Sequence, residues 1–157
     1  MVSYQELELL SRQINQAHRT AIQAELNAAG LSEVGHPMLL SILESNAPGD
    51  RAAQCHAQRD LAELLHISPA AVANSLKSLE KGGYVRREPN AGDARRNIVT
   101  LTEKGSQAVE GCHQAFERVS HRMLVGFTED EKAQLLSFRR RMLHNLRGSS
   151  SAQEEEL

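Results

Sequence analysis

Apolar residues recur every three or four positions along the first part of the chain, which is the spacing of one helix face. From Tyr4 to Ala29 there is no Pro or Gly, and Gly30 supplies a stop signal. The repeated positions are Leu7, Leu10, Ile14, Ala17, Ala21, Ala24 and Ala28. The pattern predicts a long helix with a heptad seam, which packs either against its own domain or against a second copy of the chain.

Two short helical patterns joined by a tight turn lie in the middle of the chain. Residues 59–65 have the spacing of an amphipathic helix, and His66-Ile67 follow as the turn. Ser68-Pro69 then supply an N-cap and a first-turn proline, so a second helix is predicted over 69–81, ending at Gly82-Gly83. The arrangement predicts a helix-turn-helix.

The elements on either side are also marked by pattern. An apolar helix is predicted at 36–45, a loop at 46–50, and no structure is assigned to the polar stretch 51–58. The β-prone runs 84–88 and 97–101 surround a Gly/Pro/Asn/Asp loop at 89–94, which predicts a hairpin. A long helix capped by Thr102 should reach about Leu124, and the capping box Thr128-Glu129-Asp130-Glu131 should open the last one. The apolar face of that last helix is Leu135, Leu136, Met142, Leu143 and Leu146. The predicted fold class is mainly α with a small β-hairpin wing (α+β).

Composition favours a soluble cytoplasmic protein of 157 residues. The hydrophobic share of 40% and charged share of 24% are ordinary for a globular chain. No apolar run approaches the roughly 20 residues of a membrane helix, so no membrane partner is expected. Cys55 and Cys112 have neither zinc-finger nor redox spacing, which fits a reduced compartment.

The net charge of −2 conceals a basic segment. Between Lys77 and Arg96 there are six positively and three negatively charged residues, which leaves +3, whereas Glu154, Glu155 and Glu156 are concentrated at the end of the chain. A basic strip on an acidic body is typical of nucleic-acid binding.

The helix predicted at 69–81 has two unlike faces. At 100° per residue, Val72, Leu76 and Leu79 point to the core. The opposite side, with the start of the helix, comprises Ser68, Pro69, Ala70, Asn74, Lys77 and Lys81. Small residues allow entry into the major groove, Asn74 can read adenine, and the lysines can meet phosphates. An ordinary solvated face is the alternative, because Asn and Lys are common on any surface.

The hairpin loop carries the second candidate contact. The predicted tip of the hairpin contains Asp93, Arg95 and Arg96. Packing of the core does not require two arginines at this position. A guanidinium at a hairpin tip fits a narrow minor groove, and Asp93 can orient Arg95 through a charge-assisted hydrogen bond. The alternative is a solvated charge cluster.

Residues 61–105 resemble the DNA-binding lobe of the MarR (multiple antibiotic resistance) regulators. The matching segments are Leu61-Ala62-Glu63-Leu64-Leu65, the Ser68 helix start, Leu79-Glu80-Lys81-Gly82-Gly83-Tyr84-Val85-Arg86-Arg87, Asp93-Ala94-Arg95 and Leu101-Thr102-Glu103-Lys104-Gly105. The resemblance implies a homodimeric transcriptional regulator, a repressor, that binds a pseudo-palindromic double-stranded operator and is released by a small-molecule effector. It implies that Arg95 enters the minor groove with Asp93 as its support. The added segment 48–58 departs from the family pattern.

The same resemblance implies a division into regions. These are a dimerisation helix at 1–29, a winged helix-turn-helix DNA-binding lobe at 30–102, C-terminal dimerisation helices at 103–147 and a disordered acidic tail at 148–157. Zinc-responsive members of the family place ligands on the first, second and fifth helices, where His18, His36 and Cys112 fall here. We expect these three to line an effector pocket, with no cofactor required and zinc as the alternative.

Two other function classes are disfavoured. Cys112 and His113 are neighbours on a helix and point about 100° apart, so they cannot pair as nucleophile and base. With no Gly-rich phosphate loop or nucleophile elbow, an enzyme is not expected. A winged helix that binds protein instead of DNA would present an apolar outer face and no arginine at the wing.

Overall fold

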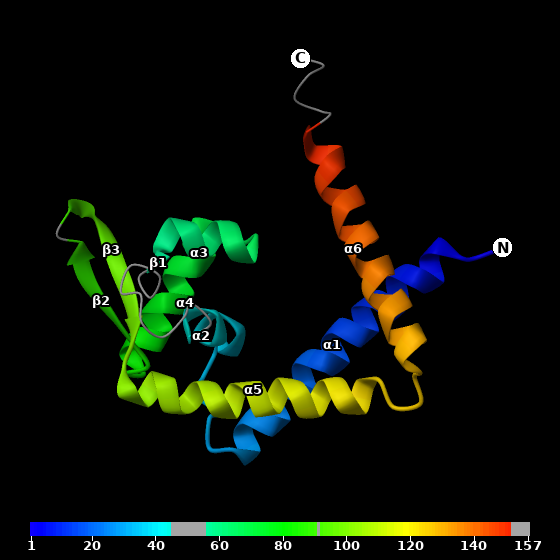
Figure 1. The fold of residues 1–157 in the computed structure, drawn as a ribbon, viewed down its shortest axis with the longest axis horizontal. Coiled ribbons are helices and arrows are strands. Elements are labelled where there is room, and N and C mark those ends of the chain that lie inside the picture. The colour runs from blue at the N-terminus through cyan, green and yellow to red at the C-terminus, as the bar shows by residue number, and fades with distance from the viewer. Residues whose placement is uncertain (45–55, 91, 152–157) are drawn as a thin grey trace. The chain divides into compact units, whose positions relative to one another are not determined.

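The computed structural model describes residues 1–44, 56–90 and 92–151, and describes only the backbone of residues 56–60, 90, 93–97 and 149–151. These residues form six helices and three strands, ordered as in Figure 1. The elements are α1 (Tyr4–Ala28), α2 (Pro37–Glu44), β1 (His56–Ala57), α3 (Gln58–Leu65), α4 (Pro69–Lys81), β2 (Val85–Asn90), β3 (Asp93–Leu101), α5 (Glu103–Met123) and α6 (Glu129–Ser151). The mainly helical fold with a hairpin wing is therefore confirmed.

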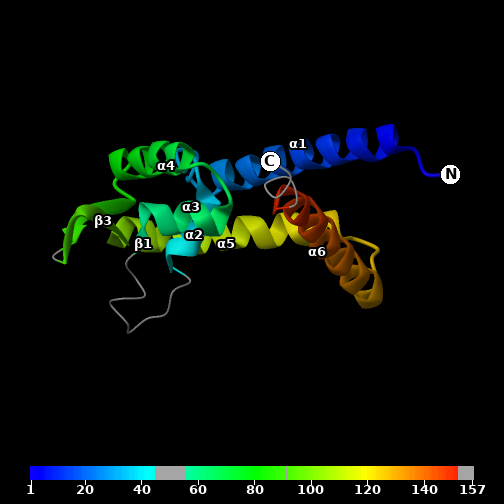
Figure 2. The same ribbon diagram turned by 90° about the horizontal axis from the view of Figure 1, so that it is seen from above.

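The chain divides into two compact units, Met1–Val119 and Ser120–Leu157. The first unit contains α1 to α4, the sheet and most of α5. Its core is aliphatic: α4 buries Val72, Leu76 and Leu79, as its apolar spacing predicted. Leu61 of α3 and Val109 of α5 join the same cluster, and α3 and α4 pack together beside the hairpin (Figures 1 and 2).

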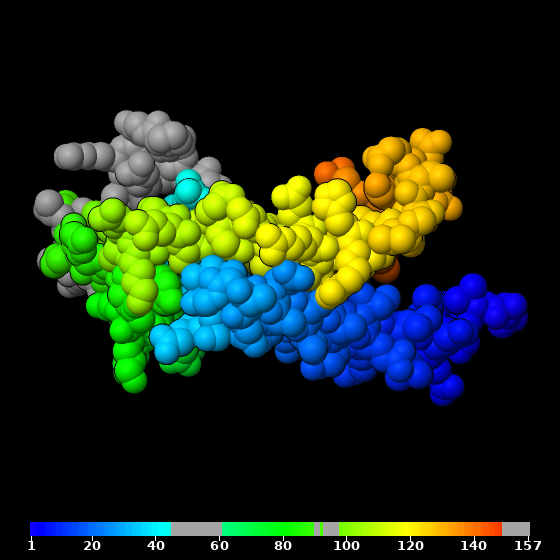
Figure 3. All heavy atoms as spheres, turned by 90° about the horizontal axis from the view of Figure 1, so that it is seen from below, coloured from blue at the N-terminus to red at the C-terminus, as the bar shows by residue number. Residues whose placement is uncertain are grey.

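Helix α1 buries a different stripe from its heptad seam. Ile22 and Leu26 are in the core, and the C-terminal half of α1 lies along α5 (Figure 3). A 3.3 Å ion pair between Glu25 and Arg118 joins the same two helices. The seam residues Leu7, Leu10 and Ile14 remain 50%, 46% and 47% exposed. Among the described residues of the first unit, packing therefore leaves the N-terminal half of the seam uncovered.

The sheet is larger and its hairpin tighter than expected. Its order is β1-β3-β2, and both pairs are antiparallel. The loop predicted at 89–94 is wrong, because β2 continues to Asn90 and β3 already begins at Asp93. Pro89 is tolerated because β2 is an edge strand, where one side of the backbone needs no partner. Strand β1, which pairs His56 with Val99, was not predicted.

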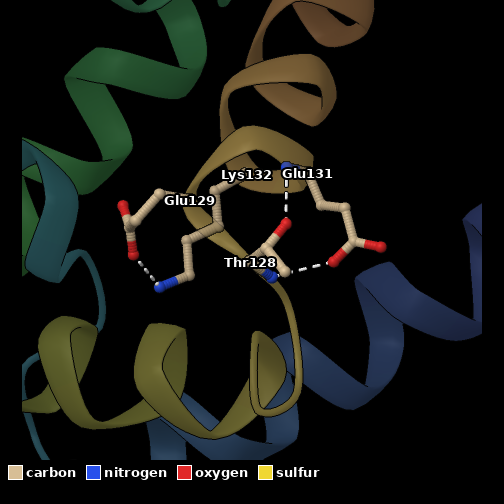
Figure 4. Close-up of polar contacts among 4 residues, drawn as sticks. All are labelled: Thr128, Glu129, Glu131 and Lys132. Atoms are coloured by element: carbon tan, nitrogen blue, oxygen red, sulfur yellow. Dashed lines mark hydrogen bonds and ion pairs between the residues drawn. The ribbon is translucent and has the colours of Figure 1, made fainter.

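Helix starts follow their capping residues closely. Thr102 Oγ1 accepts the Gly105 N–H at 3.1 Å, which confirms the predicted cap of α5. At α6, Thr128 Oγ1 accepts the Glu131 N–H at 3.2 Å, and Glu131 Oε2 accepts the Thr128 N–H at 2.8 Å (Figure 4).

Helix α6 is longer than expected. The tail was predicted to begin at residue 148, but α6 continues to Ser151. Extending an existing helix costs far less than starting one, which lets Gly148 and the serines join it. The remaining acidic residues, 152–157, lie outside the described part of the chain, as do most of the residues of the added segment 48–58.

Candidate nucleic-acid interface

The turn before α4 sets how that helix begins. Ser68 Oγ accepts the Ala71 N–H at 3.1 Å, which confirms the N-cap, and Pro69 is the first helical residue. Ile67 N–H donates to the Ala62 carbonyl at 3.3 Å, and His66 adopts a left-handed φ of 50° between the helices. The sequence marked the turn but not this conformation, which residues other than glycine seldom adopt.

The outer face of α4 is exposed as its spacing predicted. The exposed residues are Ser68, Pro69, Ala70, Asn74, Lys77 and Lys81. Within the described residues, Lys77 and Lys81 form no ion pair. Two cations and one amide on a single helix face are therefore available to a ligand with phosphates and polar edges.

The basic segment that follows is partly neutralised within the fold. Arg87 Nε lies 2.6 Å from Glu80 Oε2 and has a side chain only 25% exposed, so it ties β2 to α4. Arg86 lies 3.6 Å from Glu88 on the exposed strand. The net charge of +3 counted from the sequence therefore overstates the number of positive charges that are available to bind a polyanion.

The wing carries an irregularity where its arginines lie. Pro89 pairs with Asn97 but Asn90 pairs with Asp93, so residues 94–96 of β3 fall between consecutive pairs. Such bulges bend a strand and redirect its side chains. The side chains of Asp93, Arg95 and Arg96 lie outside the described part of the structure, and their contacts with DNA stay a prediction.

A joint of polar contacts connects the end of α4, the base of the wing and the start of α5. Thr102 Oγ1 donates to the Gly83 carbonyl and Lys104 Nζ to the Gly82 carbonyl, both at 2.6 Å. Lys104 Nζ also lies 4.5 Å from the centre of the Tyr84 ring. Residues 82–84 and 102–105 were predicted from sequence as helix ends and as parts of the resemblance, and the structure shows that they contact one another.

The helix-turn-helix and hairpin can now be compared with known proteins. A sequence model of the MarR family matches residues 29–96, which span α2, α3, α4, β2 and the start of β3. This part of the chain is similar to the MarR family.

Similar relatives carry regulator names. The chain is 34% identical over 88 residues to the HTH-type transcriptional regulator YwaE of Bacillus subtilis, covering 56% of this chain and 52% of that protein. It is 35% identical over 86 residues to the multiple antibiotic resistance protein MarR of Escherichia coli, covering 54% and 60%. The match thus spans between about half and three-fifths of these relatives.

Solved structures extend the likeness to the flanking helices. A mutant of Escherichia coli MarR complexed with operator DNA has a TM-score of 0.74 and 25% identity, covering 88% of this chain and 94% of that one. The Staphylococcus aureus MepR–DNA complex has a TM-score of 0.76 at 24% identity, covering 93% and 99%, and shows the shared fold.

The residues expected at an effector pocket have unlike surroundings in the structure. His18 is half-buried on α1, Cys112 is fully buried on α5, and His36 Nδ1 lies 3.1 Å from Ser75 Oγ. Among the described residues, no three His, Cys, Asp or Glu side chains are grouped to hold a metal ion. An open hollow lies along α1, lined by Gln16, Arg19, Thr20, Gln23, Ala24 and Asn27. Searching the same residues, we find no helix that is long and apolar enough to span a membrane.

We expect Cys112 to be chemically inert in the native protein. It has no exposed surface, and burial raises the pKa of its thiol to about 11. Because the thiolate is the reactive form, a thiol-specific disulfide reagent at about pH 8 should modify Cys112 only after guanidinium unfolding. The measurement uses a Cys55→Ser variant, so that one thiol is counted. Rapid labelling of the folded variant would contradict the buried placement.

Proposed function

We propose that the chain is a transcriptional repressor that binds double-stranded DNA in a sequence-specific manner and is released by a small effector. The observation that carries the proposal is the outer face of α4, where Asn74, Lys77 and Lys81 are exposed together. Asparagine can make a bidentate contact with adenine, and lysines can neutralise phosphates. The likeness to a MarR structure complexed with operator DNA supports the same use of the fold.

A winged helix that binds only protein is the competing function. It would need an apolar outer face on the second helix of the motif. Here the large apolar residues of α4, Val72, Leu76 and Leu79, are at most 1% exposed and belong to the core. The polar outer face therefore favours DNA as the partner.

Replacing Lys77 and Asn74 by alanine separates phosphate contacts from base reading. Lys77→Ala should weaken binding to every duplex and lower the salt slope by about one, because one phosphate contact is lost. Asn74→Ala should instead relax sequence preference by about 1–3 kcal/mol. Both are measured by titration at several salt concentrations, using a duplex that the wild-type protein selects from a random-sequence library and an unselected duplex.

Arg12→Ala is the matched control for this test. It removes one positive charge from an exposed position on α1, outside the helix-turn-helix. The control should leave both affinities close to wild type. An unchanged salt slope in Lys77→Ala would refute the assignment of this helix face, and a wild-type protein that enriches no duplex would refute the proposed function.

We also propose that the chain acts as a homodimer. Leu7, Leu10 and Ile14 of α1 are exposed, and α6 exposes Leu136, Phe138, Met142, Leu143 and Leu146. Soluble monomers rarely expose apolar residues in such numbers on helix faces. Sedimentation at micromolar concentration should give twice the chain mass of 17.3 kDa, and a stable monomer would contradict the proposal. The dimer would bind half-sites about one helical turn of DNA apart.

A further inference from the structure

One polar side chain of α4 faces inward rather than toward solvent. Ser75 is 4% exposed, and its Oγ donates to the Ala71 carbonyl at 2.9 Å. The same oxygen lies 3.1 Å from Nδ1 of His36, which is 39 residues away in sequence. With its hydroxyl proton donated to the Ala71 carbonyl, Ser75 Oγ can accept a hydrogen bond from His36 in the tautomer that carries a proton on Nδ1.

His36 comes from a short segment, residues 31–36, whose backbone is anchored at three points although His36 itself is exposed. At one end, Leu31 lies so close to Gly111 of α5 that a methyl group there would overlap Leu31 Cδ1. In its middle, Val34 has no exposed surface. At the other end, the His36 carbonyl accepts the Leu40 N–H at 3.1 Å and opens α2. The backbone of the segment is therefore held in place, and the exposed His36 side chain contacts α4 through Ser75.

The contact differs in kind from the apolar contacts of the buried face of α4. Val72, Leu76 and Leu79 make apolar contacts, which are non-directional and tolerate small rotations of a helix about its axis. A hydrogen bond weakens steeply when its angle changes. Ser75 directly follows Asn74, so a rotation that breaks the contact with His36 also turns Asn74.

We propose that His36 is a positioning residue for sequence recognition: through Ser75 it fixes the rotation of α4 and hence the direction in which Asn74 meets the bases. The inference rests on the proposed DNA binding of this helix. A phosphate contact of Lys77 is less sensitive to the rotation of α4, because the flexible lysine side chain can still reach the phosphate after a small rotation. The expected signature is a loss of discrimination with little loss of nonspecific binding.

The test compares substitutions that keep or remove a polar atom at the same place. Asparagine and leucine have nearly the same shape, but only asparagine places a hydrogen-bonding group where Nδ1 lies. His36→Leu and Ser75→Ala should each lower the ratio of selected to unselected duplex affinity by about tenfold. His36→Asn should retain most of the ratio, and the double variant His36→Leu/Ser75→Ala should lose no more than either single one.

All affinities are measured at one salt concentration, well below the melting temperature of each variant. His113→Leu, on the exposed side of α5, is the control for replacing a histidine. A purely structural role would lower the melting temperature and leave the ratio unchanged, which would overturn the proposal. An asparagine variant as defective as the leucine variant would overturn it too. If the wild-type protein discriminates between the duplexes and the variants do so equally well, only the role of His36 is refuted. If the wild-type protein selects no duplex, the proposed function is refuted as well.

Discussion

Arg95→Ala is expected to abolish tight operator binding while leaving the fold intact. Arg95 lies near the tip of the hairpin, among the residues of β3 that fall between the pairs Pro89–Asn97 and Asn90–Asp93. Residues at such tips contribute little to the core, so we expect a folding cost below roughly 0.5 kcal/mol. An arginine inserted in a narrow minor groove meets concentrated negative potential, and its removal should cost far more in binding.

The measurement pairs operator affinity at fixed salt with a thermal melt of each variant. Asp93→Ala should show a weaker form of the same defect, because Arg95 keeps its charge but loses an orienting partner. Arg12→Ala again controls for the loss of one positive charge. An Arg95→Ala protein that melts normally and binds its duplex like wild type would refute the role of the wing.

Gly105→Ala is expected to be the most destabilising single methyl addition in α5. A methyl group on Gly105 would overlap the carbonyl oxygen of Tyr84 and lie 3.1 Å from Leu101 Cδ2. The Tyr84 carbonyl belongs to the backbone and also accepts the Thr102 N–H, so it cannot move alone. Helix α5 would have to shift away from the wing and strain the joint made by Thr102 and Lys104. We expect a loss of about 3 kcal/mol, or about 10 °C in melting temperature.

Gly111→Ala provides a matched comparison on the same helix. There the added methyl meets only the end of the Leu31 side chain, which can change rotamer. Gly111→Ala should therefore melt several degrees above Gly105→Ala in the same thermal scan. Equal melting temperatures would show that the approach of α5 to Tyr84 is not a tight constraint.

Elements with local signals were predicted well from sequence. Ser68-Pro69 and Gly82-Gly83 bracket α4 so clearly that its bounds and its buried face agree with the structure. The caps at Thr102 and Thr128 were predicted for the same reason, because a capping contact spans only three residues.

Features that depend on distant residues were missed. Strand β1 has two residues and exists only because β3 offers it an edge, so no pattern in residues 51–58 could reveal it. His36 was assigned to an effector pocket on family resemblance, whereas its contact with Ser75 joins positions that no local periodicity relates. The bulge in β3 likewise appears only once the register of the pair is known.

The placement of β2 also bears on solubility. A hairpin at the end of a sheet leaves one strand edge open, and an open edge favours pairing with other chains and aggregation. Here that edge belongs to β2, whose sequence includes Pro89 and the exposed charges of Arg86 and Glu88. Proline removes a donor and charges resist close stacking, so the hairpin can protrude at high protein concentration without becoming a template for fibre growth.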